Sequence, residues 1–203
     1  MKEKQAIFKP IFGDSWLTLP PVMKLHYANR PDSTEEYLAV GELEVKAAPA
    51  LRLIAPVLRL LGGPPVVNAR NVPVTVCFKS EPHKDTLHFV RTFHFSGKPP
   101  YVFHSRMVPS GGNRVAEVMK FGLVWRMKYK WQEGRVILEH DGYALNFFGK
   151  RLRVPLTWIL GSVHAEEHPI DDTHFSMKVG ITHPLWGFVY GYRGWFKMEQ
   201  PDG

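Results

Sequence analysis

Among the residues that could bind a ligand, Arg91 has the most unusual position in the sequence. It lies on the apolar face of an alternating run, among Leu87, Phe89, Phe93 and Phe95. A guanidinium on such a face needs a partner, because removing a charge from water is costly. Glu117 stands in a comparable position, so we favour a structural Arg91–Glu117 ion pair inside a sheet. Two alternatives stay open: Arg91 faces a cavity, where its forked donors bind a carboxylate or phosphate, or a bulge turns it to solvent.

The segment His164–His168 holds two histidines and two glutamates, which are residue types that bind metals. Its spacing is not that of a metalloprotease helix, and we expect it to form a strand. Histidines four residues apart on a strand are about 13 Å apart at a rise of about 3.3 Å per residue, too far to share one zinc ion. Glu166 could bind a metal with one of them, but we favour a polar sheet face. We predict no metal site and no cofactor.

The other reactive residues show no catalytic arrangement. Cys77 alternates with apolar neighbours and has no base beside it, which is typical of a small buried or half-buried thiol. His104 and Ser105 point to opposite faces of one expected strand, so they cannot form a nucleophile–base pair. We therefore assign no catalytic residue and favour a non-catalytic protein. If it is an enzyme, Glu117, Glu166 or a histidine would act.

Charge and composition limit the classes of binding partner and the cellular compartment that we expect for this protein. The formal net charge of +7 permits contact with nucleic acid, anionic lipid or acidic partners. Nucleic acid is disfavoured, because the two tryptophans within 125–131 fall on the face opposite its three basic residues. A single cysteine agrees with a reducing compartment. The first ten residues lack the apolar run of a signal peptide, and we expect a cytoplasmic protein.

Alternation of apolar and polar residues from residue 36 onward predicts a mainly β protein. The clearest run begins at Phe121 and continues through Trp131, and others cover 37–46, 72–78, 161–169 and 174–182. The turns between the runs are too short for crossover helices. We therefore predict an antiparallel meander of about nine or ten strands, curled into a barrel or half-barrel. Residues 1–203 are expected to form one domain, with a β-rich core at 36–199.

Two helical segments are expected beside the strands. Residues 12–28 predict a loop and a short N-terminal helix that has Pro20 and Pro21 at its first turn. Residues 49–61 are nearly all apolar and predict a second helix, which Pro56 should kink or split. We expect this second helix to plug one end of the barrel. The alternative is a lid or an element that makes peripheral contact with an anionic membrane.

The segment 183–196 combines aromatic residues with glycines near the C-terminus. It is expected to form a bent or bulged closing strand that seals the core. Its charged residue, Arg193, is a candidate to pair with Glu166 or with a ligand.

Motifs along the chain resemble a bacterial family of domains of unknown function, numbered 4166. The resemblance rests on Gly13–Pro20, Leu25-His26, Val72–Val76, Arg91–Phe93, Ser105, Glu117, Phe121-Gly122, Phe148-Gly149, Glu166 and the stretch from Pro184 to Gly194. The family has no established activity, so the resemblance implies no mechanism. Its members look like the C-terminal part of larger proteins with a nucleotide-binding oxidoreductase domain. This chain lacks the Gly-x-Gly-x-x-Gly segment, so any redox role would belong to a separate partner.

Together these features predict a non-catalytic, lipocalin-like binding module for a small apolar or acidic ligand. Arg91 is its expected polar anchor, and the further candidate ligand-binding residues are Glu117, Ser105, Glu166 and Arg193. The alternative is an accessory or docking domain for a partner oxidoreductase. An enzyme of unknown reaction comes after both.

Overall fold

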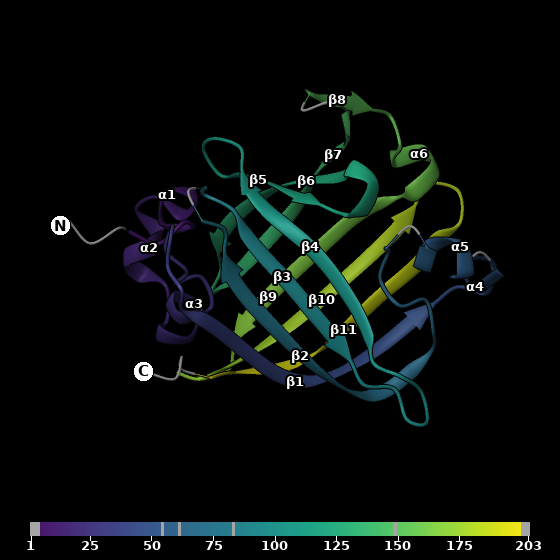
Figure 1. The fold of residues 1–203 in the computed structure, drawn as a ribbon, viewed down its shortest axis with the longest axis horizontal. Helices are drawn as coiled ribbons and strands as arrows, with labels where there is room; N and C mark the ends of the chain where they lie inside the picture. The colour runs from purple at the N-terminus through teal and green to yellow at the C-terminus, as the bar shows by residue number, and fades with distance from the viewer. Residues whose placement is uncertain (1–4, 54, 61, 83, 148–149, 200–203) are drawn as a thin grey trace.

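Ten antiparallel strands close into a barrel in the computed structural model, which describes residues 5–199 except 54, 61, 83 and 148–149 (Figure 1). The ring follows the chain from β1 to β7, continues through β9, β10 and β11, and returns to β1. Its strands are β1 (Glu36–Ala47), β2 (Ala69–Ser80), β3 (Leu87–Phe93), β4 (Tyr101–Pro109), β5 (Arg114–Val118), β6 (Leu123–Gln132), β7 (Arg135–Phe147), β9 (Ser162–Pro169), β10 (His174–His183) and β11 (Gly187–Glu199). The short β8 (Lys150–Val154) pairs with β7 outside the ring. The predicted antiparallel meander is confirmed, and it is a closed barrel.

The predicted alternation sends one side chain in two to the barrel interior. In β3 the buried positions are 87, 89, 91 and 93, the face on which Arg91 was expected. The prediction for 121–131 is wrong at its first residue. Phe121 has a φ of 58°, which turns it out of the strand into the short 3-10 helix η1 (Lys120–Gly122) and leaves it 69% exposed. Val124 is buried on the outside of the barrel, where it packs in a small cluster with Ala116, Val118 and Ala144.

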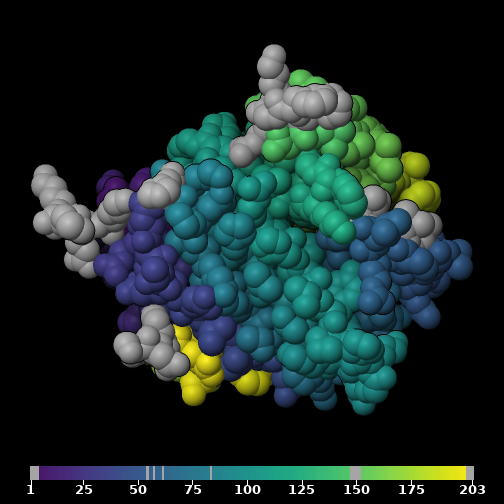
Figure 2. Space-filling model, in the orientation of Figure 1, coloured from purple at the N-terminus to yellow at the C-terminus, as the bar shows by residue number. Residues whose placement is uncertain are grey.

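The N-terminal segment folds into three short helices, α1 (Lys9–Phe12), α2 (Ser15–Thr18) and α3 (Pro21–His26). Pro21 is the first residue of α3 and Pro20 is its N-cap, as the sequence predicts. The buried rings of Phe8 and Tyr27 pack against each other, 5.0 Å between centroids. Both also contact Tyr129 of β6, so this segment covers one end of the barrel, at the left of Figures 1 and 2.

The opposite end carries the segment between β1 and β2. The described residues of its expected helix lie in α4 (Pro49–Leu53) and α5 (Ala55–Leu60), and Pro56 lies in the first turn of α5. The Tyr101 hydroxyl of β4 donates to the Gly63 carbonyl at 2.7 Å, which ties the segment to the barrel. Another short helix, α6 (Thr157–Leu160), lies between β8 and β9 at the same end (Figure 1). No helix in the described part of the chain is long and apolar enough to span a membrane.

The C-terminal aromatic segment forms β11, which pairs with both β1 and β10. The expected bulge is present in β11 at Val189, because Ile181 of β10 pairs with Tyr190 and the next residue, Thr182, pairs with Phe188. The aromatic side chains divide between the faces: Tyr190 and Phe196 are buried, whereas Phe188 and Trp195 are exposed. The segment is therefore the closing strand of the barrel: it pairs with the first strand, β1, and seals the core, as predicted.

Candidate functional site

Three of the predicted site residues meet inside the barrel. Arg91, Ser105 and Glu117 come from the neighbouring strands β3, β4 and β5, and all three are buried. Arg91 Nη1 donates to Ser105 Oγ at 3.0 Å, and its Nη2 donates to Glu117 Oε1 at 3.1 Å. Ser105 Oγ donates to the same carboxylate oxygen at 2.6 Å. The structural ion pair that the sequence favours is thus present, with a serine bridging its partners.

The Arg91 guanidinium lies over two aromatic rings. Its central carbon lies 5.0 Å from the Phe89 ring centroid and 4.9 Å from that of Phe103. Such contacts stabilise a desolvated cation by about 2 kcal/mol. Burial opposes the charged guanidinium, but the Glu117 carboxylate together with Tyr192 and Tyr129 outweighs this effect, and the pKa of Arg91 is raised. Arg91 is therefore held as a cation in an apolar interior.

A small cavity of about 20 Å³ adjoins this cluster. Its wall includes three residues with polar side chains, Arg91, Tyr192 and His26 of α3. The rest of the wall is apolar and comes from Ala39, Leu43, Val74, Val76, Phe78, Phe89, Phe93, Phe175, Met177 and Phe196. A cavity of this size holds about one water molecule. The barrel is therefore largely filled by its own side chains.

A second buried polar cluster centres on Glu167. Its Oε2 accepts a hydrogen bond of 2.5 Å from the Tyr27 hydroxyl, and its Oε1 lies 3.6 Å from His26 Nε2. His26 is buried, and its other ring nitrogen, Nδ1, has no hydrogen-bond partner among the described residues. Burial and then the Glu167 charge raise the pKa of Tyr27 well above its ordinary value. The cluster fastens the N-terminal helices to β9 through a charged hydrogen bond.

The charges of both clusters influence the pKa values of two tyrosines. Burial, followed by the charges of Glu167 and Glu117, raises the pKa of Tyr129 well above its ordinary value. Burial raises the pKa of Tyr192 to about 12, although the Arg91 cation opposes this shift. Charges of both clusters therefore act on each of these two tyrosines in the barrel interior.

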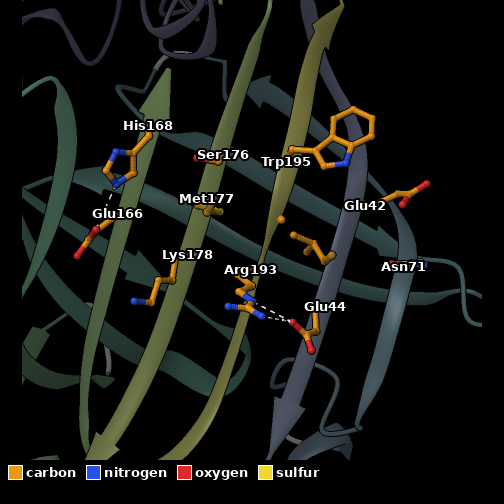
Figure 3. A pocket seen from close by; sticks show the side chains of 12 residues that line it. Glu42, Glu44, Asn71, Glu166, His168, Ser176, Met177, Lys178, Arg193 and Trp195 are labelled. Carbon is orange, nitrogen blue, oxygen red and sulfur yellow. Dashed lines mark hydrogen bonds and ion pairs between the residues drawn. The ribbon is translucent and has the colours of Figure 1, made fainter. Parts of the chain in front are cut away.

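Glu166 and Arg193 do not join this interior region. They lie on the outside of the barrel, along an open groove of about 470 Å³ that crosses β9, β10, β11 and β1 (Figure 3). Arg193 Nε donates to Glu44 Oε2 at 2.8 Å, and Glu166 contacts His168 at 3.2 Å and Arg135 at 3.5 Å. The predicted Arg193–Glu166 pairing is therefore wrong: Lys178 of β10 stands between them in the strand register.

The remaining reactive residues that the structure describes form no catalytic arrangement. Cys77 is half-buried, and its Sγ lies 3.5 Å from a Glu36 carboxylate oxygen. Burial and then Glu36 raise the pKa of this thiol, which lowers its reactivity. His104 contacts His88 on the outside of the sheet, while Ser105 faces inward. Among the described residues, no group of three histidine, cysteine or acidic side chains is placed to hold a metal ion.

The sequence reasoning missed Glu167, Tyr27 and His26. In the polar segment 164–168 we expected a polar face, but the alternation of β9 buries Val163, Ala165 and Glu167 together. That period of two was the available signal. For His26 and Tyr27, the signal was their place beside the apolar Val22 and Met23 on a helix that covers the barrel.

Comparison with known proteins places the chain among uncharacterised domains. No curated protein matches the sequence. One solved structure that resembles it is the crystal structure of Rv2717c from M. tuberculosis, with a TM-score of 0.49 and 10% sequence identity over 93% of this chain and 99% of that chain. A family model described as "Domain of unknown function (DUF4166)" matches residues 19–196. The match covers most of the sequence, and the chain belongs to the DUF4166 family.

Proposed function

We propose that this domain is a non-catalytic binding module that takes a small, largely apolar molecule into the barrel. The observation that carries the proposal is the interior cavity, whose apolar wall contains two polar features. These are Arg91 and His26, and among the described residues His26 Nδ1 has no hydrogen-bond partner. Apolar walls with a few polar groups are the usual composition of small-molecule sites.

The charges around the cavity favour a neutral ligand over an acid. The Arg91 cation is already paired with Glu117, and Glu167 adds a second buried carboxylate near His26. A ligand carboxylate would have to displace Glu117 and would leave that charge buried and unpaired, which is costly. A neutral ligand with one hydrogen-bonding group avoids this cost and can pair with His26 Nδ1. Of the two ligand chemistries predicted from the sequence, the arrangement supports the apolar one.

Ligand entry requires the interior side chains to move, because the cavity of about 20 Å³ holds only one water molecule. Met177 is half-buried in the cavity wall, and the unbranched methionine side chain adapts to irregular space at low cost. We therefore expect small ligands to bind first, and affinity to increase when wall side chains are shortened.

Saturation-transfer NMR with indole tests this proposal, since indole is small, neutral and carries one N–H donor. Indole should bind, and Met177→Ala should bind it more tightly because the substitution enlarges the cavity. Val76→Phe should fill the cavity and abolish the signal, whereas Val102→Phe, at an exposed position on β4, should leave it unchanged. Indole-3-acetate should bind more weakly than indole.

Circular dichroism of each variant verifies folding before binding is compared. The proposal fails if indole gives no signal with both the native protein and the folded Met177→Ala variant. It also fails if folded Val76→Phe and Val102→Phe bind indole equally well, because the ligand would then lie outside the barrel.

A further inference from the structure

The net charge of the chain is concentrated at one end of the barrel, which we call the basic end. It is formed by the described residues of the connections at 48–68, 94–100, 119–122, 148–161 and 184–186. In sequence, these five connections contain no aspartate or glutamate and seven basic residues: Arg52, Arg59, Lys98, Lys120, Lys150, Arg151 and Arg153. Seven equals the formal net charge of the whole chain, so the remainder carries nineteen charges of each sign.

The described basic side chains at this end are exposed and have no carboxylate within ion-pair distance among the described residues. They are Arg52, Arg59, Lys98, Lys120 and Arg153. The barrel wall is different. There the single carboxylate of Asp141 lies within 4 Å of three basic side chains, those of Arg114, Arg126 and Lys128. The wall neutralises its own charge, whereas the basic end leaves its charge available to a partner.

The same end exposes large apolar side chains. Leu53 on α4 is 84% exposed, Trp158 on α6 is 69% exposed, and Trp186 before β11 is 71% exposed. Further exposed apolar residues at this end are Leu60, Phe121, Leu152, Ile159, Leu185 and Phe188. So much exposed apolar surface, interspersed with unpaired cations, indicates an interaction surface.

Contacts between the connections make these residues one continuous surface. The Ala48 amide donates to the Val189 carbonyl at 2.8 Å, which sets the start of α4 beside β11. The Lys120 side chain lies against Gly62, just beyond α5. The α6 helix packs beside β10, where Gly161 approaches the Thr182 carbonyl. Figure 1 shows α4, α5 and α6 gathered at the right of the barrel, and Figure 2 shows the α4–α5 segment projecting there in blue.

From this charge and apolar exposure we infer that the basic end docks on the surface of an anionic lipid bilayer. Lipid phosphates offer the charge that the unpaired arginines and lysines lack, at about 1 kcal/mol for each basic residue near the surface. The headgroup region also admits exposed leucine and tryptophan side chains, which a hydrated nucleic-acid backbone would leave in water. This inference concerns the outer surface and does not depend on ligand binding inside the barrel.

Vesicle co-sedimentation tests the inference with the whole protein. Vesicles of phosphatidylcholine with about one third phosphatidylglycerol should bind the protein, and phosphatidylcholine alone should bind it far less. Removing two charges by Arg52→Gln with Arg59→Gln should weaken binding about 30-fold, which is about 1 kcal/mol for each arginine. A matched loss of two charges on the remainder of the surface, Lys84→Gln with Lys197→Gln, should weaken it much less.

Tryptophan fluorescence then tests the orientation. Anionic vesicles should shift the emission to shorter wavelength, and Trp158→Phe with Trp186→Phe should remove most of that shift. The inference is overturned if neither vesicle binds, or if the two charge pairs weaken binding equally. It is also overturned if single-stranded RNA binds more tightly than anionic vesicles and Arg52→Gln with Arg59→Gln abolishes RNA binding alone.

Discussion

Arg91 Nη2 and Glu117 Oε1 lie 3.1 Å apart inside the barrel, on strands that are separated by β4. Ser105 of β4 fills the intervening position and hydrogen-bonds to both. The register explains this contact, because Arg91 is opposite Phe103, and Glu117 is opposite Met107, so Ser105 lies diagonally between them. Diagonal neighbours on one face of a sheet are within reach of long side chains. The ion pair therefore fixes three strands relative to one another.

Breaking this pair should destabilise the fold strongly. Arg91→Met leaves Glu117 buried without its cation, and we expect the free energy of unfolding to fall by about 3–5 kcal/mol. Glu117→Gln should cost a similar amount for the converse reason. The double variant Arg91→Met with Glu117→Leu removes both charges, and it should recover much of the loss. Urea unfolding followed by circular dichroism measures all three.

The exposed Arg193–Glu44 pair provides the control for that experiment. Exposed ion pairs contribute little to stability, so Arg193→Gln should change the free energy of unfolding far less than Arg91→Met does. Equal effects of Arg91→Met and Arg193→Gln would contradict the structural role that we assign to the buried pair.

The sequence was informative wherever a contact depends on the alternation of one strand. Arg91 and Glu117 each interrupt an apolar face, and a buried charge needs an opposite one, so their pairing could be predicted. Arg193 shows the limit of that reasoning. Its partner, Glu44, lies 149 residues earlier in the chain and becomes a neighbour only because β11 pairs with β1. Strand order around a barrel is a property of the whole chain, and no local pattern encodes it.

The buried tyrosines should make the protein sensitive to alkaline pH. A tyrosine whose pKa is raised by folding holds its proton more tightly in the folded state, as Tyr27, Tyr129 and Tyr192 do. Below about pH 10, the ordinary tyrosine value, both states are protonated and the full stability is present. Above it the unfolded chain loses protons first. Stability should therefore fall with rising pH, by about 1.4 kcal/mol per pH unit for each such tyrosine.

Tyr27→Phe tests this linkage directly. At pH 8 the variant should be less stable than the native protein by about 1–2 kcal/mol, because Glu167 loses a hydrogen bond. From pH 10 to 11 that difference should shrink, because phenylalanine has no proton to lose. Urea unfolding at half-unit pH steps measures the difference. A gap that stays constant or grows above pH 10 would show that Tyr27 ionises normally in the folded protein.

Glycines at the seam between β1 and β11 should tolerate no side chain. A Cβ at Gly194 would collide with the Glu42 carbonyl and the Leu43 side chain, and one at Gly41 would collide with the Trp195 carbonyl. Backbone atoms on a paired strand cannot move aside without breaking ladder hydrogen bonds. We therefore expect Gly194→Ala to lower the free energy of unfolding by at least about 2 kcal/mol.

Gly180→Ala is the matched control, since Gly180 lies on the adjacent strand β10 and a Cβ there would meet nothing within 4 Å. It should leave stability unchanged or raise it slightly, because alanine restricts the unfolded chain more than glycine does. Thermal unfolding of the two variants side by side decides the matter. If Gly194→Ala and Gly180→Ala melt together, the close approach of β1 and β11 at this seam is not what requires glycine in the closing segment.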